Sequence, residues 1–137
     1  MNKNKGFSLV ELIVVVAIMA VLVGILAPAY LSYVEKTRRG TDENMAEEVR
    51  HTIEVSAADI CVYDELKAGN ITFTFSNGTT IATIDTSKCA FTEAMKDTYA
   101  DKKFNIKSKK YGSKSYKVQV GAAANDGAAL TVTGSWN

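Results

Sequence analysis

The sequence predicts an α+β protein, in which a long amino-terminal α-helix packs on a carboxyl-terminal antiparallel β-sheet with one short extra helix. Two patterns support this prediction. An apolar run passes directly into an amphipathic stretch with helical spacing, and the second half of the chain then changes to alternating apolar and polar residues. Of the 137 residues, about 100 lie outside the apolar run, which is enough for one small domain.

The apolar run extends from Gly6 to Tyr30, and Glu11 is its only charged residue. At about 1.5 Å of rise per residue, a helix of this length covers the roughly 30 Å hydrocarbon core of a bilayer. Lys3 and Lys5 precede the run, so the positive-inside rule places the amino terminus in the cytoplasm. The first half of the long helix is therefore expected to span a membrane.

Glu11 is the unusual residue of this run. An ionised carboxylate inside a bilayer costs roughly 2.5 to 3.5 kcal/mol on insertion scales, so acids at membrane depth are usually functional. Glu11 is therefore interpreted as a functional group. The alternative is a simple anchor that tolerates one polar residue near its end.

Beyond Pro28 the pattern becomes amphipathic, and one continuous helix is expected over residues 8–58. Gly24 and Pro28 weaken this helix. Proline has no N–H to donate to the carbonyl of Gly24, and glycine is about 1 kcal/mol poorer than alanine in a helix. This short segment is the predicted break or melting point, and a mild bend in an intact helix is the alternative.

After the helix, residues 61–70 are expected to form a connecting loop that leads into a β-hairpin. The apolar residues of 71–75 alternate with polar ones up to Asn77-Gly78, which favours a two-residue type I′ turn. The turn places the apolar side chains of both strands on one face. The expected pairs are Phe75 with Thr80, Phe73 with Ala82 and Ile71 with Ile84.

A second, short helix is predicted over residues 88–99, because capping residues precede it and apolar residues recur on one face. Three alternating runs after it predict strands, joined by three-residue loops at 110–112 and 125–127 with Gly127 in the left-handed conformation. The pairs expected from these loops are Phe104 with Val118, Ile106 with Tyr116, Val120 with Val132 and Ala122 with Leu130.

Cys61 and Cys89 are the only cysteines, and both lie in the part that is placed outside the membrane. A disulfide between them is favoured there, and the chain-entropy model puts its contribution at very roughly 3 to 4 kcal/mol. Two reduced cysteines are the alternative, because pairing cannot be read from spacing.

The sequence predicts no catalytic, cofactor or metal site. His51 is the only histidine and has charged neighbours on the predicted helix, and the chain has no Gly-rich phosphate loop. Seven lysines between residues 102 and 117 alternate with aromatic residues, a pattern that nucleic-acid binding proteins also show. Lysines on the solvent side of an antiparallel sheet also block edge-to-edge aggregation, so nucleic-acid binding is unsupported.

The stretch KGFSLVEL at residues 5–12, followed by an apolar segment up to Pro28, resembles the amino-terminal signature of type IV pilins and the related pseudopilins of type II secretion systems. The signature combines a short basic leader that ends in glycine, an aromatic residue, a glutamate four residues later and the proline. Many members close a carboxyl-terminal loop with a disulfide, whereas Cys61 and Cys89 lie earlier here, so adhesive roles of that loop do not transfer.

The resemblance implies a type IV pilin-like fold and a processing pathway. A prepilin peptidase would cut after Gly6, Phe7 would become the N-methylated first residue, and Glu11 would face the amino group of Phe7 in a neighbouring subunit and set the register of assembly. The helix near Gly24 and Pro28 would be able to unwind in the filament. The expected division is a leader peptide at residues 1–6, a transmembrane and polymerisation helix at 7–30, and a globular headpiece at 31–137.

The implied function is structural: a membrane-anchored precursor that assembles into an extracellular homo-oligomeric filament without cofactors or catalytic activity of its own. The expected partners are the prepilin peptidase, the membrane before assembly, and a pilus assembly platform with its ATPase. Adhesion, motility, biofilm formation and DNA uptake all fit. One alternative is a pseudopilin of a secretion or competence system, and a less favoured one is a membrane-anchored binding protein or enzyme with a similar amino terminus.

Overall fold

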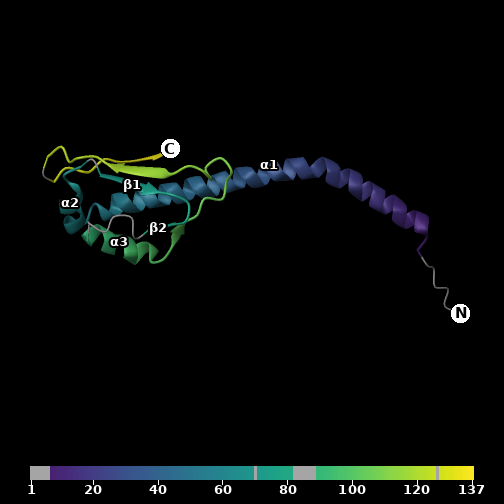
Figure 1. Cartoon of the computed structure of the whole chain (residues 1–137), viewed down its shortest axis with the longest axis horizontal. Coiled ribbons are helices and arrows are strands. Elements are labelled where there is room, and N and C mark those ends of the chain that lie inside the picture. The colour runs from purple at the N-terminus through teal and green to yellow at the C-terminus, as the bar shows by residue number, and fades with distance from the viewer. Residues whose placement is uncertain (1–6, 70, 82–88, 126) are drawn as a thin grey trace. The chain divides into compact units, whose positions relative to one another are not determined.

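The computed structural model describes residues 7–69, 71–81, 89–125 and 127–137. Within these residues the chain forms a long helix, two short helices, a three-stranded sheet and a two-stranded sheet, which is the predicted α+β, type IV pilin-like fold (Figure 1). It divides into two compact units, Met1–Lys36 and Thr37–Asn137. In chain order, the elements are α1 (Leu9–Ser56), α2 (Ile60–Leu66), β1 (Ile71–Phe75), β2 (Thr79–Thr80), α3 (Cys89–Tyr99), β3 (Lys103–Phe104), β4 (Tyr116–Val120) and β5 (Val132–Trp136).

Helix α1 confirms the predicted long helix to within two residues at each end. It continues through Gly24 and Pro28, so the isolated chain has an intact helix at the predicted melting point. In the first unit, every large apolar side chain from Phe7 to Tyr33 is exposed. In the second unit, the buried residues of α1 are Asp42, Ala46, Val49 and Ile53, whose spacings of three and four define one face.

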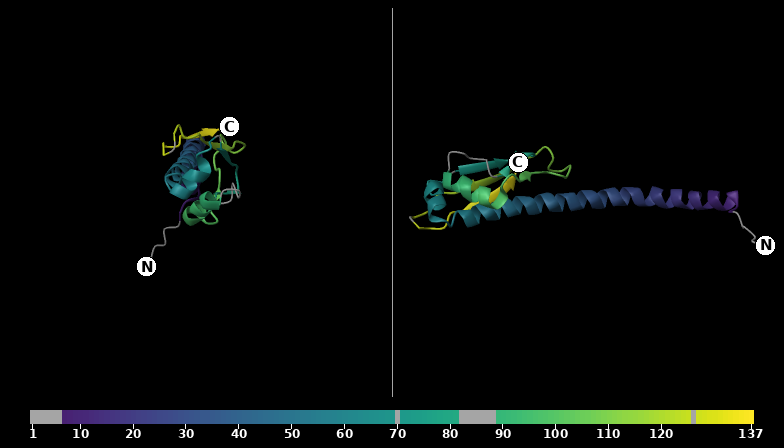
Figure 2. Two further views of the ribbon diagram at one scale, coloured as in Figure 1. Left: turned by 90° about the vertical axis from the view of Figure 1, so that its left-hand side faces the viewer. Right: turned by 90° about the horizontal axis from the view of Figure 1, so that it is seen from below.

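The core of the second unit lies between that face of α1, the three-stranded sheet, and the helices α2 and α3. Figures 1 and 2 show the sheet along one side of α1 and α3 along another. Phe73 of β1 stacks on Phe91 of α3 with ring centroids 4.5 Å apart. The hydroxyls of Thr52 on α1 and Tyr99 on α3 are hydrogen bonded at 2.9 Å, so α3 is fixed at both its ends.

Strand β4 is the centre of the larger sheet, whose order is β1-β4-β5 with antiparallel pairs. The predicted hairpin at Asn77-Gly78 is therefore wrong, because Phe75 pairs with Tyr116 instead of Thr80. Gly78 does turn the chain, with a φ of 83°, but the following strand leaves the sheet and pairs with β3. Ala82 and Ile84, the other expected partners in that hairpin, lie outside the described residues.

The predicted hairpin at residues 110–112 is also wrong. Phe104 pairs with Thr79, and β4 pairs only with β1 and β5 among the described strands. The physical reason is the buried carboxylate of Asp42, which accepts the backbone N–H groups of Lys107 and Ser108 at 2.9 and 2.8 Å. These bonds hold the chain against α1 and replace the expected return across the sheet.

Between β4 and β5 the predicted register and the left-handed Gly127 are confirmed, but the predicted pair of Ala122 with Leu130 is not formed. Val120 pairs with Val132, and Gly127 has a φ of 84°, a left-handed conformation that glycine adopts at no steric cost. The ladder ends at that pair, so Leu130 lies before β5 and Ala122 is not part of the sheet. Asp126 lies outside the described residues.

Residues 61–70 do not form the predicted loop, because most of them belong to α2. Asp59 caps this helix by accepting the N–H of Cys61 at 2.9 Å, and Val62 and Leu66 are buried in the core. The other short helix, α3, starts one residue after the predicted start and ends at Tyr99 as predicted. Phe91, Met95 and Tyr99 form its buried face.

Candidate functional site

The candidate functional site is the apolar helical segment from Phe7 to Tyr33. Its large apolar side chains keep 44 to 86% of their surface exposed, and they are distributed around the whole helix. A helix that is apolar on all sides is stable only when lipid or other helices surround it. The segment is long and apolar enough to cross a membrane, with a mean hydropathy of 3.1 over its most apolar window.

Glu11 lies in the first turn of α1 and is exposed. The amino-terminal end of a helix carries a partial positive charge, which favours a carboxylate at this position. In apolar surroundings, however, this partial charge replaces only part of the lost hydration, and a carboxylate without a cationic partner is strongly unfavourable. A cation near Glu11 would therefore stabilise the carboxylate once lipid or other helices surround this part of the helix.

The other predicted residues of the site lie around it. Phe7 is exposed and precedes the first turn of α1, and Gly24 and Pro28 lie within the helix. Gly6, the predicted cleavage position, lies outside the described residues.

The predicted cysteine pair is not present as a disulfide in the structure. Cys61, in the first turn of α2, is exposed and its thiol is free. The side chain of Cys89 lies outside the described residues, but its backbone begins α3. Glu65, one turn after Cys61, accepts the N–H groups of Ala90 and Phe91 at 3.1 Å, so the two helices meet near both cysteines. Pairing in an oxidising compartment stays a prediction.

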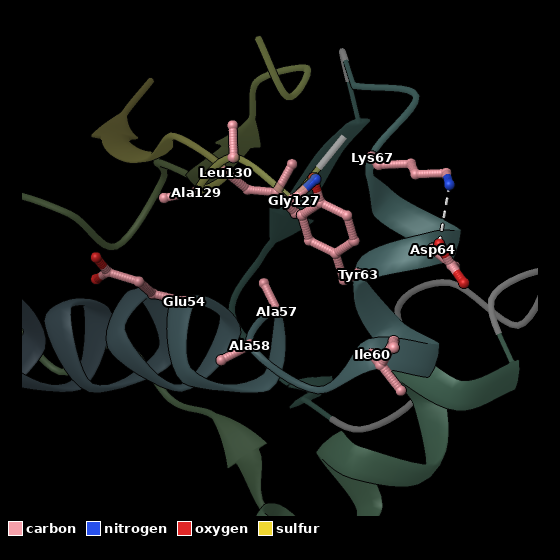
Figure 3. Close-up of a pocket in the computed structure, with 11 residues that line it drawn as sticks. Glu54, Ala57, Ala58, Ile60, Tyr63, Asp64, Lys67, Gly127, Ala129 and Leu130 are labelled. Atoms are coloured by element: carbon pink, nitrogen blue, oxygen red, sulfur yellow. Dashed lines mark hydrogen bonds and ion pairs between the residues drawn. The ribbon is translucent and has the colours of Figure 1, made fainter. Parts of the chain in front are cut away.

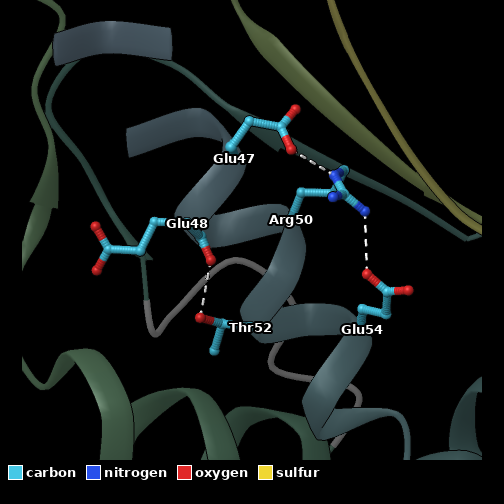
Figure 4. Close-up of polar contacts among 5 residues, drawn as sticks. All are labelled: Glu47, Glu48, Arg50, Thr52 and Glu54. Atoms are coloured by element: carbon cyan, nitrogen blue, oxygen red, sulfur yellow. Dashed lines mark hydrogen bonds and ion pairs between the residues drawn. The ribbon is translucent and has the colours of Figure 1, made fainter. Parts of the chain in front are cut away.

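Polar contacts along the second half of α1 stabilise the helix (Figure 4). Arg50 binds Glu47 at 2.8 Å and Glu54 at 3.1 Å, and the hydrogen bond to Glu47 is the main reason why the pKa of Arg50 is raised. Burial raises the pKa of Tyr99, although its hydrogen bond to Thr52 acts in the opposite direction. His51 is exposed, as predicted. The ion pairs of Arg50 lie on a solvated face of the helix, whereas the bond between Thr52 and Tyr99 joins α1 to α3 in a partly buried position.

Two features of the second unit were missed from the sequence. One is the loop at residues 107–114, which the buried Asp42 holds and whose Tyr111 donates a hydrogen bond to Glu43 at 2.6 Å. The other is a pocket of about 910 Å³ at the end of α1 (Figure 3).

Among the described residues, no group of three or more His, Cys, Asp or Glu side chains is placed to hold a metal ion.

Comparisons with known proteins address the amino-terminal segment. The profile described as the prokaryotic N-terminal methylation motif matches residues 1–27. That match covers Gly6, Phe7 and Glu11. The amino-terminal region therefore carries the prokaryotic N-terminal methylation motif. The motif lies at the start of the exposed apolar segment of α1.

The chain is also similar to individual fimbrial and prepilin-type proteins. The chain is 47% identical over 38 residues to fimbrial protein Q and, with the same values, to the type IV major alpha-pilin, both of Moraxella bovis; the match covers 28% of this chain and 24% of each relative. It is 31% identical over 77 residues to prepilin peptidase-dependent protein A of Clostridium perfringens, covering 56% of this chain and 54% of that relative. The matched part therefore spans about a quarter to a half of these curated relatives. No solved structure matches the chain.

Proposed function

We propose that this prepilin-type protein is a structural pilin subunit, which is cut after Gly6, methylated at Phe7 and polymerised into an extracellular type IV filament. One observation carries the proposal: a membrane-length helix is apolar and exposed on all sides and has a single carboxylate in its first turn. The methylation motif over residues 1–27 supports it.

The proposed polymerisation exchanges one apolar environment for another. In the precursor, lipid surrounds the helix at residues 7–30; in the filament, helices of identical subunits replace the lipid. This exchange changes little in hydrophobic free energy, so polar contacts decide the register. The ammonium group of Phe7 on one subunit and the carboxylate of Glu11 on its neighbour supply opposite charges, which at 4 Å attract by about 4 kcal/mol for an effective dielectric constant of 20.

The proposal divides the chain into three segments. Residues 1–6 are the leader, residues 7–30 are the membrane anchor and then the filament core, and residues 31–137 are the headpiece on the filament surface. Lys3 and Lys5 keep the leader in the cytoplasm. The Clostridium relative is named prepilin peptidase-dependent protein A, which supports a prepilin peptidase as the first partner. An assembly platform with an ATPase is the second, because extraction from the bilayer requires an energy source.

Gly24 and Pro28 mark the segment where the helix can unwind in the filament core. The helix is intact there in the isolated chain, but proline leaves one carbonyl without its partner and weakens the turn around it. Each residue that changes from helix to extended chain adds about 1.8 Å of length. Unwinding a single turn therefore moves the headpiece along the filament axis without a change in the contacts of Glu11.

Substitution of Glu11 tests the proposal in cells that produce the protein. Glu11→Ala and Glu11→Gln both remove the negative charge, and Glu11→Gln keeps the size of the side chain. We expect both variants to insert in the membrane and to keep the fold of the second unit, but to release few or no filaments on shearing. The matched control is Glu93→Ala, which removes an exposed carboxylate from α3. Normal filament yield from Glu11→Gln would refute the pairing role. Confinement of the chain to a secretion complex, without surface filaments, would favour the pseudopilin alternative.

A further inference from the structure

The pocket at the end of α1, called the end pocket here, is a hollow in the headpiece that the described residues leave unfilled (Figure 3). Its volume of about 910 Å³ lies in the range of binding sites. Part of its wall carries only small side chains, because Gly127, Ala128 and Ala129 of the connection between β4 and β5 line it. Ile60 on the rim keeps 74% of its surface exposed.

The rim of the end pocket carries carboxylates that can accept a cation from outside. Asp64 is 61% exposed and binds Lys67 at 2.9 Å, three residues further along α2. Glu54 is 52% exposed and binds Arg50 at 3.1 Å on α1. Exposed pairs between close neighbours on one helix are weak, so either carboxylate is able to exchange its partner for another cation.

Positive charge is concentrated in the lysine loop, defined as residues 107–114. Lys107, Lys109, Lys110 and Lys114 belong to it, and all four are exposed. The loop is held in one conformation although it lacks regular structure. Asp42, which is fully buried, accepts the two N–H groups at its start, and Tyr111 stacks on Trp136 with ring centroids 4.2 Å apart.

A loop that is already fixed loses little conformational freedom when it binds. Burial of the Asp42 carboxylate carries a desolvation cost, which the hydrogen bonds to the loop offset. We take this cost as a sign that the conformation of the loop contributes to function as well as to stability. The backbone that carries the lysine side chains is thus held in place by these contacts. Lys110 lies over the ring of Tyr111, with its Nζ 4.8 Å from the centroid.

The lysine loop and the end pocket lie at different ends of the headpiece. Asp42 supports the loop and Ala57 lines the pocket, and their separation along α1 is about 22 Å at 1.5 Å per residue. A single copy therefore cannot bring them together. A contact between two different surfaces of identical subunits is heterologous, and it builds an open chain of copies instead of a closed dimer.

We propose that the end pocket of one copy receives the lysine loop of a second copy. The ammonium group of Lys110 pairs with Asp64 at the rim, while its methylene chain covers the apolar surface of Ile60. The inference deepens the proposed function and depends on it, because it adds a specific contact between headpieces to the bundle of apolar helices.

Disulfide trapping in the full-length protein tests this contact. Lys110→Cys and Asp64→Cys are combined in a chain whose two native cysteines are serine, and isolated filaments are oxidised mildly. Every copy then has one thiol at each end, so we expect a ladder of covalent oligomers longer than a dimer. The matched control is Lys110→Cys with Asp97→Cys, because Asp97 is exposed on α3 outside the pocket. It should give no ladder.

The outcomes separate this inference from the function it rests on. Filaments that form normally, but give no more ladder than the control, would overturn the head contact and leave the pilin proposal intact; the pocket would then belong to another occupant, such as a small organic cation. Absence of filaments from the unmodified protein would overturn both. A ladder specific to the pair at 64 and 110 supports the contact.

A charge exchange provides a second measurement in the native cysteine background. Lys110→Asp and Asp64→Lys each place like charges in contact, and we expect each to lower filament yield by about tenfold. The combined variant restores opposite charges in reversed order and should recover most of the yield. A combined variant no better than either single one would contradict the pairing of these two residues.

Discussion

Truncation of Asp42 is the sharpest test of how the headpiece is built. The Asp42 side chain is fully buried, and its two oxygens accept the N–H groups of Lys107 and Ser108 at 2.9 and 2.8 Å. Hydrogen bonds to a charged group contribute about 1.5 to 3 kcal/mol each. Part of this is regained in Asp42→Ala, because the loop lies at the surface and water hydrates its N–H groups after it detaches. We therefore expect the free energy of unfolding to fall by about 3 kcal/mol, the lower end for two such bonds.

For a unit of this size, each kcal/mol lowers the melting temperature by about 4 to 8 °C, so the expected decrease is about 12 to 24 °C. Trp136 is the only tryptophan and stacks on Tyr111 of the lysine loop, so its fluorescence reports both unfolding of the headpiece and detachment of the loop. Asp97→Ala, at an exposed position on α3, is the control and should melt like the unmodified protein.

Asp42→Asn refines the test. The amide keeps one acceptor oxygen but directs its NH₂ group at the second backbone N–H, so its loss of stability should lie between those of the control and Asp42→Ala. A decrease below about 1 kcal/mol for Asp42→Ala, within the range of ordinary surface substitutions, would refute the view that this carboxylate holds the loop.

Three further predictions concern the same headpiece. Gly134→Ala places a methyl group against the hydroxyl of Tyr116 on the neighbouring strand and should lower the free energy of unfolding by about 1 to 3 kcal/mol, measured by thermal melting; an unchanged melting temperature would contradict this close contact. Burial raises the pKa of Tyr99 and Tyr116, so the unfolded chain loses these protons first. Their contribution to stability is complete below pH of about 10 and is lost as the pH rises through the folded values; melting temperatures constant across that range would exclude it. If Cys61 and Cys89 pair after export, mass spectrometry without reductant will find the chain lighter by two hydrogens, and labelling of both thiols in exported protein would show that they stay reduced.

Local patterns were sufficient to predict several elements. The length and periodicity of α1 follow from its apolar run and the amphipathic stretch after it. The left-handed Gly127 and the pairing of Val120 with Val132 follow from matching the apolar faces of the two strands. In these cases the residues that determine the structure are close together in the sequence, or they lie on one helix face.

Nonlocal contacts account for the wrong predictions. The alternation in β1 specifies which face is apolar, but Thr80 and Tyr116 are equally acceptable partners for Phe75 on that criterion, and the structure selects Tyr116. The loop after β3 depends on Asp42, whose carboxylate has no visible purpose in an amphipathic helix until the loop is placed beside it. The Asp59 cap was a local signal for α2 that the loop prediction disregarded.

The functional segment was easier to predict than the end pocket. An apolar run with one carboxylate is distinctive in sequence, and Glu11 lies where the helix begins. The end pocket has no sequence signature, since the small residues Gly127, Ala128 and Ala129 line it together with Tyr63 from a distant part of the sequence. A pocket forms where neighbouring side chains do not fill the space between them, and the sequence alone does not show which side chains become neighbours.

The most direct test of the account is mass spectrometry of the mature chain taken from isolated surface filaments. The account predicts an amino terminus at Phe7 that carries one methyl group, with residues 1–6 absent. A filament subunit that retains residues 1–6, or a chain found only in the membrane and never in filaments, would contradict it.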